Sequence, residues 1–184
     1  MTLTPKIGFI CGSTRQGSIN QQLKKELIKR AKAQGARTTD IDLGSFDLPL
    51  FHGDLDRPKA LKKLTAKIKG CDGIVVVSPE YNGGLPPLLK NAIDWISTAD
   101  SQAFTRPVYG IASCTPGPMS GIMCMRQLNY ILMRVGAHVV PAQVGTGMAN
   151  QAFDANGVLV SQPSADLADK MLDQMITWIH QKAS

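Results

Sequence analysis

Residues 73–95 read GIVVVSPEYNGGLPPLLKNAIDW, an apolar run followed by a turn-rich loop and an amphipathic segment. The run Gly73–Val77 is continuously apolar and rich in β-branched residues, which is typical of a strand buried on both faces of a parallel sheet. Pro86 and Pro87 predict the start of a helix, because the first helical turn does not need their missing N–H groups. The stretch therefore predicts one strand–loop–helix unit.

The same alternation of strands and helices continues in both directions along the chain. It predicts a three-layer, doubly wound α/β fold with a five-stranded parallel sheet. The 184 residues suit a single domain that spans 1–184. Ligands of such folds bind beyond the carboxyl ends of the strands, so the loops after the first, third and fourth strands are the places to search. The expected strands lie at residues 6–11, 37–43, 73–77, 107–112 and 137–144, and the expected helices begin near residues 19, 58, 86, 119 and 164.

Composition and charge disfavour several classes of protein. The net charge is +6, but most lysines lie on the solvated faces of two expected helices without interleaved aromatic residues, so we expect no nucleic-acid binding. The long uncharged stretches are broken by Pro, Gly, Ser or Asn, which predicts no membrane span. No basic-then-apolar leader is present, and we expect a cytoplasmic protein. The four cysteines form no C-x-x-C pair, so no metal site is expected.

The loop after the first expected strand, Gly12–Asn20, reads GSTRQGSIN. It brings hydroxyl groups, a guanidinium, a carboxamide and backbone N–H groups to the N-terminus of a helix, where a phosphate is stabilised by the helix dipole and by unpaired amides. Hydroxyls and amides suit a terminal phosphate monoester. The spacing excludes a P-loop and a G-x-G-x-x-G dinucleotide motif. An N-capping, glycine-rich turn without a ligand remains the alternative.

Cys11 precedes this loop, as a cysteine does in the C-x5-R loop of small tyrosine phosphatases. The sixth position after Cys11 is Gly17, and the only arginine of the loop is Arg15. The group that would bind a transferred phosphate is therefore missing, and we expect no nucleophilic role for Cys11.

The loop Ser78–Pro87 places an aromatic residue on a glycine-containing turn. Tyr81 can provide an apolar wall for a flat heteroaromatic ring, and backbone N–H groups around Asn82–Gly84 can reach its oxygen and nitrogen atoms. In the helix that follows, we expect Trp95 to pack in the core rather than to stack on a ligand.

Three motifs together resemble the NADPH-dependent FMN reductase family, which includes chromate, quinone and azo reductases. The motifs are Gly12-Ser13-Thr14-Arg15-x-x-Ser18-x-Asn20, Pro79-Glu80-Tyr81-Asn82 and Leu89-Lys90-Asn91-Ala92-Ile93-Asp94-Trp95. The resemblance covers essentially the whole chain, with the motifs in the right order. It implies a flavodoxin-like fold with strand order 2-1-3-4-5, a non-covalent FMN, and a homodimer or homotetramer with flavin sites near the subunit boundary.

The resemblance also implies which residues bind the cofactor. The phosphate loop would be formed by Ser13, Arg15, Ser18 and Asn20, with Gln16 and Ile19 in the same turn; the loop against the flavin ring would be formed by Pro79, Glu80, Tyr81 and Asn82, with Gly83 beside them. Ser113 matches a third loop and is expected to contact the ribityl chain or the pyrimidine edge. The segment Cys114–Pro118 departs from the family pattern, because its two prolines remove amide donors.

The expected function is an FMN-dependent oxidoreductase. Hydride from NADPH or NADH would pass to the flavin, and a small acceptor such as a quinone, an azo compound, free flavin or a metal oxyanion would take the electrons. The flavin performs the chemistry, so we expect no catalytic side-chain acid or base. One alternative is a flavodoxin-type electron carrier, although such carriers typically have acidic surfaces. The other is a nucleotide- or nucleic-acid-binding protein without a redox role.

Overall fold

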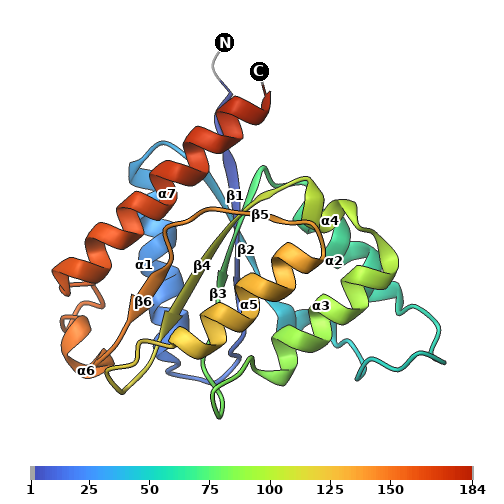
Figure 1. The fold of residues 1–184 in the computed structure, drawn as a ribbon, viewed down its shortest axis with the longest axis horizontal. Helices are drawn as coiled ribbons and strands as arrows, with labels where there is room; N and C mark the ends of the chain where they lie inside the picture. Colours follow the sequence, from blue (N-terminus) through green and yellow to red (C-terminus); the bar gives the residue numbers. More distant parts are fainter. Residues whose placement is uncertain (1–2, 184) are drawn as a thin grey trace.

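The computed structural model describes residues 3–183 and contains a six-stranded parallel sheet (Figure 1). The strand order β2-β1-β3-β4-β5, with β6 paired to β4, confirms the expected flavodoxin-like topology. The strands are β1 (Lys6–Cys11), β2 (Arg37–Ile41), β3 (Gly73–Val77), β4 (Val108–Cys114), β5 (His138–Val139) and β6 (Val144–Thr146). The helices are α1 (Ile19–Ala33), the 3-10 helix η1 (Leu43–Phe46), α2 (Lys59–Lys69), α3 (Pro87–Ala99), α4 (Gln102–Thr105), α5 (Ile122–Arg134), α6 (Ala149–Ala152) and α7 (Gln162–Ala183).

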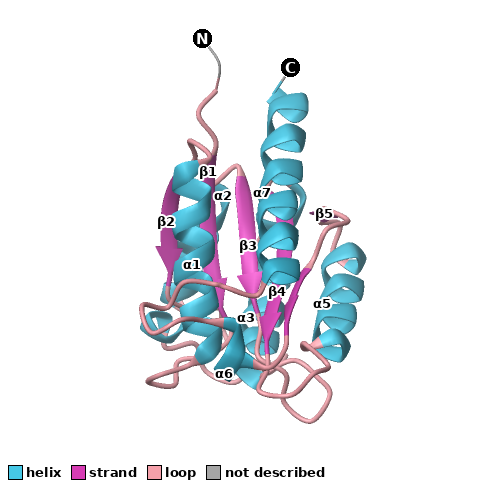
Figure 2. Ribbon diagram, turned by 90° about the vertical axis from the view of Figure 1, so that its left-hand side faces the viewer, coloured by secondary structure: helices cyan, strands magenta, loops and turns pink. Residues whose placement is uncertain are grey.

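Helices cover both faces of the sheet. Figure 1 shows α1 and α7 on one side and α2, α3 and α5 on the other, and Figure 2 shows α1 and α7 in front of the strands. The core is divided in the same way, because Val75 and Val77 belong to the cluster under α1 and α7, while Ile74 and Val76 belong to the opposite cluster. Alternate residues of β3 thus face two apolar layers, as its uninterrupted apolar sequence predicts.

The prediction of one continuous fifth strand over residues 137–144 is wrong. The segment forms two short strands, β5 and β6, which both pair with β4. Pro141 lies between them and has no N–H to donate to a strand ladder. The next amide, that of Ala142, donates to Gln174 Oε1 of α7 at 2.9 Å instead of to β4.

The prediction of a helix start at Met119 is also wrong. Helix α5 begins at Ile122, because Ser120 and Gly121 have φ angles of 56° and 72°. Left-handed backbone of this kind cannot belong to a right-handed helix. These residues belong to the loop between β4 and α5. The candidate site is built at this end of the sheet, so the difference in backbone matters for the site.

Trp95 packs in the core as expected. Its side chain is buried, its Nε1–H donates to Pro49 O at 2.7 Å, and its ring meets that of Phe51 edge to face at 5.0 Å. Helix α3 is thereby fixed against the segment that follows η1.

Candidate functional site

The loops that follow β1, β3 and β4 meet at the carboxyl edge of the sheet, at the opposite end from the two chain termini (Figure 2). Gly12 joins the first two of these loops. Its N–H donates to Val77 O at 2.8 Å, and a Cβ at this position would lie 2.8 Å from Pro86 Cγ and 3.2 Å from Pro79 Cδ. Glycine is therefore required for the β1–α1 loop to approach the β3–α3 loop this closely.

The β1–α1 loop presents unpaired backbone donors at the start of α1. Ser18 is the N-cap, and its Oγ accepts from the N–H of Gln21 at 3.4 Å. Residues 14–17 are exposed, and within residues 3–183 their N–H groups donate no hydrogen bond. The first turn of α1 carries no acidic residue. Free amides and the positive end of a helix form a site suited to an anion such as a phosphate group.

The predicted phosphate-loop residues fall into two groups. The side chains of Arg15 and Gln16 are exposed and make no hydrogen bond or ion pair within the described part of the chain. Ser13 is buried, and its carbonyl oxygen accepts from Gln21 Nε2 at 2.6 Å. Ile19 is half-buried and packs against the core beneath α1. The side chains of the first group are therefore exposed at the edge of the site, whereas Ser13 and Ile19 are packed into the loop and the core.

Asn20 connects α1 to the end of β4. Its Nδ2 donates to Cys114 O at 2.8 Å, and its Oδ1 accepts from the N–H of Cys114 at 2.9 Å. The carboxamide is buried and uses its polar atoms in this pair of bonds. In this structure Asn20 therefore positions the predicted phosphate loop, and its carboxamide does not point out of it.

The predicted flavin-ring loop is a tight β-hairpin. Tyr81 and Gly84 exchange N–H···O bonds of 3.0 Å in both directions. Asn82 and Gly83, at the two turn positions, have φ angles of 51° and 75°, which is the geometry of a type I′ turn. Tyr81 remains 49% exposed on this turn. The sequence thus builds a rigid platform that carries an accessible aromatic ring.

Glu80 attaches this hairpin to α5. Its Oε2 accepts from the N–H groups of Met123 and Cys124, both at 3.1 Å, and Gln127 Oε1 accepts from the N–H of Leu85 at 2.8 Å. Gly121, the N-cap residue of α5, has no side chain with which to cap the helix. The Glu80 carboxylate, which belongs to the β3–α3 loop, caps the helix instead. Its negative charge is favourable at the helix N-terminus.

We expect Glu80→Ala to lower the free energy of unfolding by about 1–2 kcal/mol, because two amides of α5 lose their acceptor. Urea unfolding of the FMN-free protein measures the change. Hydrogen exchange at Met123 and Cys124 should accelerate in parallel. Glu80→Gln keeps an oxygen acceptor and should lose less than half as much stability; equal losses in the two variants would contradict the capping role.

Ser113 lies beneath the β4–α5 loop. Its side chain is fully buried, and its Oγ accepts from Cys124 Sγ at 3.5 Å. A Cβ on Gly121 would lie 1.9 Å from that Oγ, so the loop covers the hydroxyl directly. The contact between Ser113 and the cofactor stays a prediction, and it requires the covering loop to move. The part of this loop exposed at the edge is the segment 116–119.

The four cysteines, Cys11, Cys71, Cys114 and Cys124, are free and buried. Burial raises the pKa of the Cys11 thiol, and it raises the pKa of Cys114 to about 12. The site thus offers no activated thiol.

Within residues 3–183 no group of three or more His, Cys, Asp or Glu side chains is placed to hold a metal ion, and no helix is long and apolar enough to cross a bilayer.

At about pH 8 we expect the four thiols of the native protein to resist a disulfide reagent such as DTNB. Desolvation raises each thiol pKa, so the reactive thiolate is scarce and buried. The release of thionitrobenzoate measures the reaction, and unfolding in guanidinium should make all four thiols react. A native thiol that reacts as fast as free cysteine would contradict the buried placement.

Several contacts that hold the site together have no signal in the sequence. Gln127 contacts Leu85 across 42 positions, and Asn20 contacts Cys114 across 94. Gly121 was detectable in principle, since a glycine that precedes an apolar helix often marks a left-handed turn. A groove of about 530 Å³ also adjoins the start of α1, between Ile19, Pro116 and the α6 segment.

Known proteins resemble this chain in sequence and in fold. A family model described as NADPH-dependent FMN reductase matches residues 5–151. A quinone reductase of Escherichia coli (strain K12) is 31% identical over 163 residues, which cover 85% of this chain and 86% of that protein. An NAD(P)H-dependent FMN reductase of Pseudomonas aeruginosa is 28% identical over 179 residues, 95% of each chain. The solved structure of FerB, a flavoenzyme NAD(P)H:(acceptor) oxidoreductase from Paracoccus denitrificans, superposes with a TM-score of 0.79 and 25% identity over 96% of this chain and 98% of that one.

Proposed function

Because the chain belongs to the NADPH-dependent FMN reductase family, we propose that it takes hydride from NADPH or NADH and passes the electrons to a quinone. The protein is an oxidoreductase that uses FMN and NAD(P)H. FMN, when bound, supplies the ring that receives the hydride and releases the electrons. The choice of a quinone rests on the Escherichia coli relative, which is named for quinone reduction. Azo compounds, free flavin and metal oxyanions are the other acceptors to be compared.

One observation carries the proposal: the unpaired amides at the start of α1 and the exposed Tyr81 hairpin lie at the same edge of the sheet. The amides of residues 14–17, with Ser18, Arg15 and Gln16, would hold the phosphate of FMN. The hairpin would hold its ring. These two surfaces match the two ends of the cofactor in chemistry, an anion site and an apolar wall with donors.

The remaining residues orient the ligand and keep the site in place. Tyr81 provides the wall, and the N–H groups of Asn82 and Gly83, which donate no hydrogen bond within residues 3–183, are available to ring oxygen and nitrogen atoms. Glu80 fixes the hairpin against α5, and the carbonyl oxygen of Pro79 accepts from the hydroxyl of Ser78 at the end of β3. We assign no side chain to proton transfer, since the protein's contribution is orientation and electrostatic stabilisation.

The test is spectroscopic. The purified protein is supplemented with FMN, desalted, and its absorbance recorded before and after anaerobic addition of NADPH or NADH. Retained flavin bands that bleach, and that return when a benzoquinone is added, are expected. Retained bands that do not bleach would favour an electron carrier, and the absence of retained flavin would contradict the proposal at its first step. Parallel additions of an azo dye and a metal oxyanion rank the acceptors.

We also propose that copies of this chain associate through the outer face of α5. Three apolar side chains of α5 are exposed, Met123, Tyr130 and Met133 at 49%, 67% and 61%, and Met119 in the loop before the helix is exposed at 63%. Helix α5 supports the Tyr81 hairpin, so a second copy covering these side chains would lie beside the proposed flavin site. Sedimentation at increasing protein concentration tests this association, and a monomer at every concentration would contradict it.

A further inference from the structure

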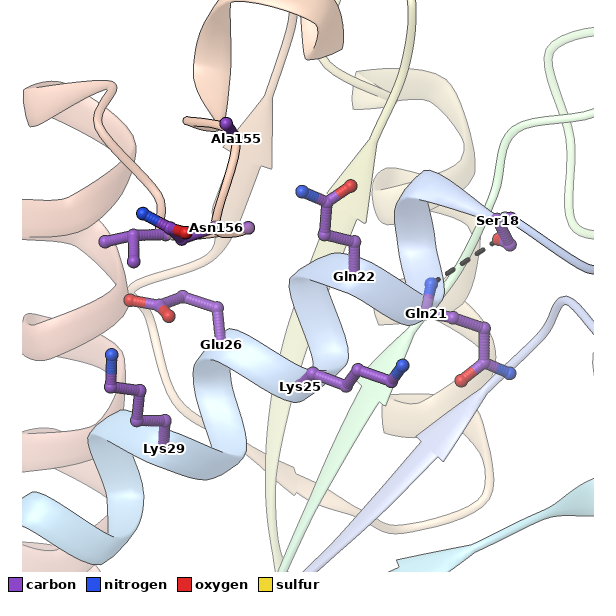
Figure 3. Close-up of a pocket in the computed structure, with 11 residues that line it drawn as sticks. Ser18, Gln21, Gln22, Lys25, Glu26, Lys29, Ala155 and Asn156 are labelled. Atoms are coloured by element: carbon purple, nitrogen blue, oxygen red, sulfur yellow. Dashed lines mark hydrogen bonds between the residues drawn. The ribbon is translucent and has the colours of Figure 1, made fainter.

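A second groove runs along the exposed side of α1 and begins at the phosphate loop (Figure 3). Its volume is about 510 Å³, and Gly17 and Ser18 form its first end. The far wall is the turn formed by residues 155–158. Ligand pockets for small molecules commonly measure roughly 300–1,000 Å³, so the groove is large enough for a single nucleotide.

The floor of the groove is polar and carries two lysines. Lys25 and Lys29 are both exposed and lie one helical turn apart on α1. Figure 3 shows Lys25 extending toward Gln21 and the start of the helix, while Lys29 extends toward the opposite wall. One acidic side chain, Glu26, also lines the groove. Its Oε1 accepts from Arg30 Nε at 2.9 Å, and Arg30 Nη1 also pairs with Asp169 Oδ2 at 2.8 Å. These three groups together carry one negative charge, so the two lysines leave the groove with a positive charge of one.

The opposite wall is preformed. Asp154 Oδ1 accepts from the N–H groups of Asn156 and Val158 at 2.9 and 2.8 Å, and the N–H of Asp154 donates to Val158 O at 3.0 Å. Gly157 completes the turn with a φ of 77°. One oxygen of the Asp154 carboxylate is thus occupied within its own turn. Toward the groove the turn offers the apolar surface of Val158 and the carboxamide of Asn156, which suit the face and the edge of a flat base.

We propose that this groove binds a phosphorylated adenosine group. The proposal rests on the proposed function, because the FMN phosphate then occupies the loop whose end, Gly17 and Ser18, is also the end of the groove. Two ligands that fit the proposed function carry such a group, FAD and NADPH. The adenylate half of FAD is joined directly to the FMN phosphate and would continue into the groove, and the adenosine 2′-phosphate end of NADPH would lie beside it. In both cases Lys25, the lysine nearer to the start of α1, pairs with the additional phosphate, Lys29 adds positive charge beside the adenosine, and the turn 155–158 holds the base.

The experiment compares ligands that differ only by this group. Quenching of flavin fluorescence gives the dissociation constants of FMN and FAD for the FMN-free protein, and calorimetry of the FMN-loaded protein gives those of adenosine 2′,5′-bisphosphate and adenosine 5′-monophosphate. The test variant is Lys25→Ala/Lys29→Ala. The matched control is Lys62→Ala/Lys63→Ala, which removes the same charge from two exposed lysines of α2 outside the groove.

We expect the test variant to weaken the binding of FAD, or of the bisphosphate, by about tenfold, since two positive charges beside the adenosine group are lost. The dissociation constant of FMN should change by less than about threefold. In the control variant the dissociation constants of FAD and of the bisphosphate should also change by less than about threefold. A lysine-dependent advantage of FAD over FMN identifies FAD as the source, and a lysine-dependent advantage of the bisphosphate over the monophosphate identifies NADPH. If FMN binds but neither advantage depends on the two lysines, the groove proposal is overturned while the proposed function stands. Failure to bind FMN at all would instead contradict the proposed function.

Discussion

Gly121→Ala should lower the free energy of unfolding by more than 4 kcal/mol, or prevent the protein from folding. A Cβ at this position would lie 1.9 Å from Ser113 Oγ and 2.6 Å from Ser113 Cβ, and both atoms belong to the buried strand β4. The φ of 72° adds a backbone cost of about 1 kcal/mol for any residue with a side chain. Overlap with a rigid core and backbone strain together place the substitution among the severe ones. Urea unfolding of the FMN-free protein measures it.

Gly35→Ala separates the two causes. Gly35 has a φ of 85° and no heavy atom within 4 Å of its hypothetical Cβ, so this variant experiences the backbone cost alone, about 1 kcal/mol. Adding Ser113→Gly to Gly121→Ala removes the atoms that overlap and should recover part of the lost stability, which a double-mutant cycle quantifies. If Gly121→Ala were no worse than Gly35→Ala, the packing of the β4–α5 loop on Ser113 would be wrong.

The layers of the fold were predictable because they depend on local patterns. Continuous apolar residues in Gly73–Val77 require burial on both faces, and the structure places them between two apolar clusters. The fifth strand was mispredicted because its apolar pattern continues through Pro141, whose missing N–H ends the ladder there. The short helices α4 and α6 have four residues each, too few for a periodic pattern.

The sequence predicted which loops lie together at the carboxyl edge of the sheet, but not what each polar residue in them contacts. Spacing after the strands located the β1–α1 and β3–α3 loops, but it did not distinguish side chains that face a ligand from side chains that build the loop. Asn20 and Glu80 are both polar residues within recognisable motifs, yet their polar atoms bond to Cys114 and to the first turn of α5. These partners lie at least 43 positions away, and only the tertiary fold brings them within hydrogen-bonding distance.

The three loops of the site are therefore one connected unit. Gly12 packs the first loop on the second, Asn20 ties the first to the end of β4, and Glu80 ties the second to α5. A motif that combines ligand-facing and loop-building residues keeps its geometry before the ligand arrives. Pre-organisation of this kind lowers the entropic cost of binding. It also means that the anion site can be tested by altering its charge while its connections are left in place.

Ser18→Asp should weaken FMN binding at least a hundredfold without destabilising the protein. Ser18 caps α1 by accepting from the N–H of Gln21, and aspartate is as good an N-cap as serine and favourable at the positive end of a helix. The new carboxylate would lie beside the amides of residues 14–17 that are proposed to hold the FMN phosphate, and it would repel that phosphate. Repulsion between a carboxylate and a phosphate dianion a few ångströms apart is on the order of 3 kcal/mol or more at a protein surface, which corresponds to the stated loss.

Two comparisons make the test specific. Riboflavin lacks the phosphate, so its affinity should be the same for Ser18→Asp and for the unaltered protein, and the advantage of FMN over riboflavin should disappear. Ser18→Asn is a neutral cap of similar size and should keep FMN binding within about tenfold. Equal losses in the Asp and Asn variants would show that a lost hydroxyl rather than charge is responsible. Unchanged FMN binding in Ser18→Asp would show that the phosphate does not lie at the start of α1, because no anion site there tolerates a fixed negative charge at its N-cap.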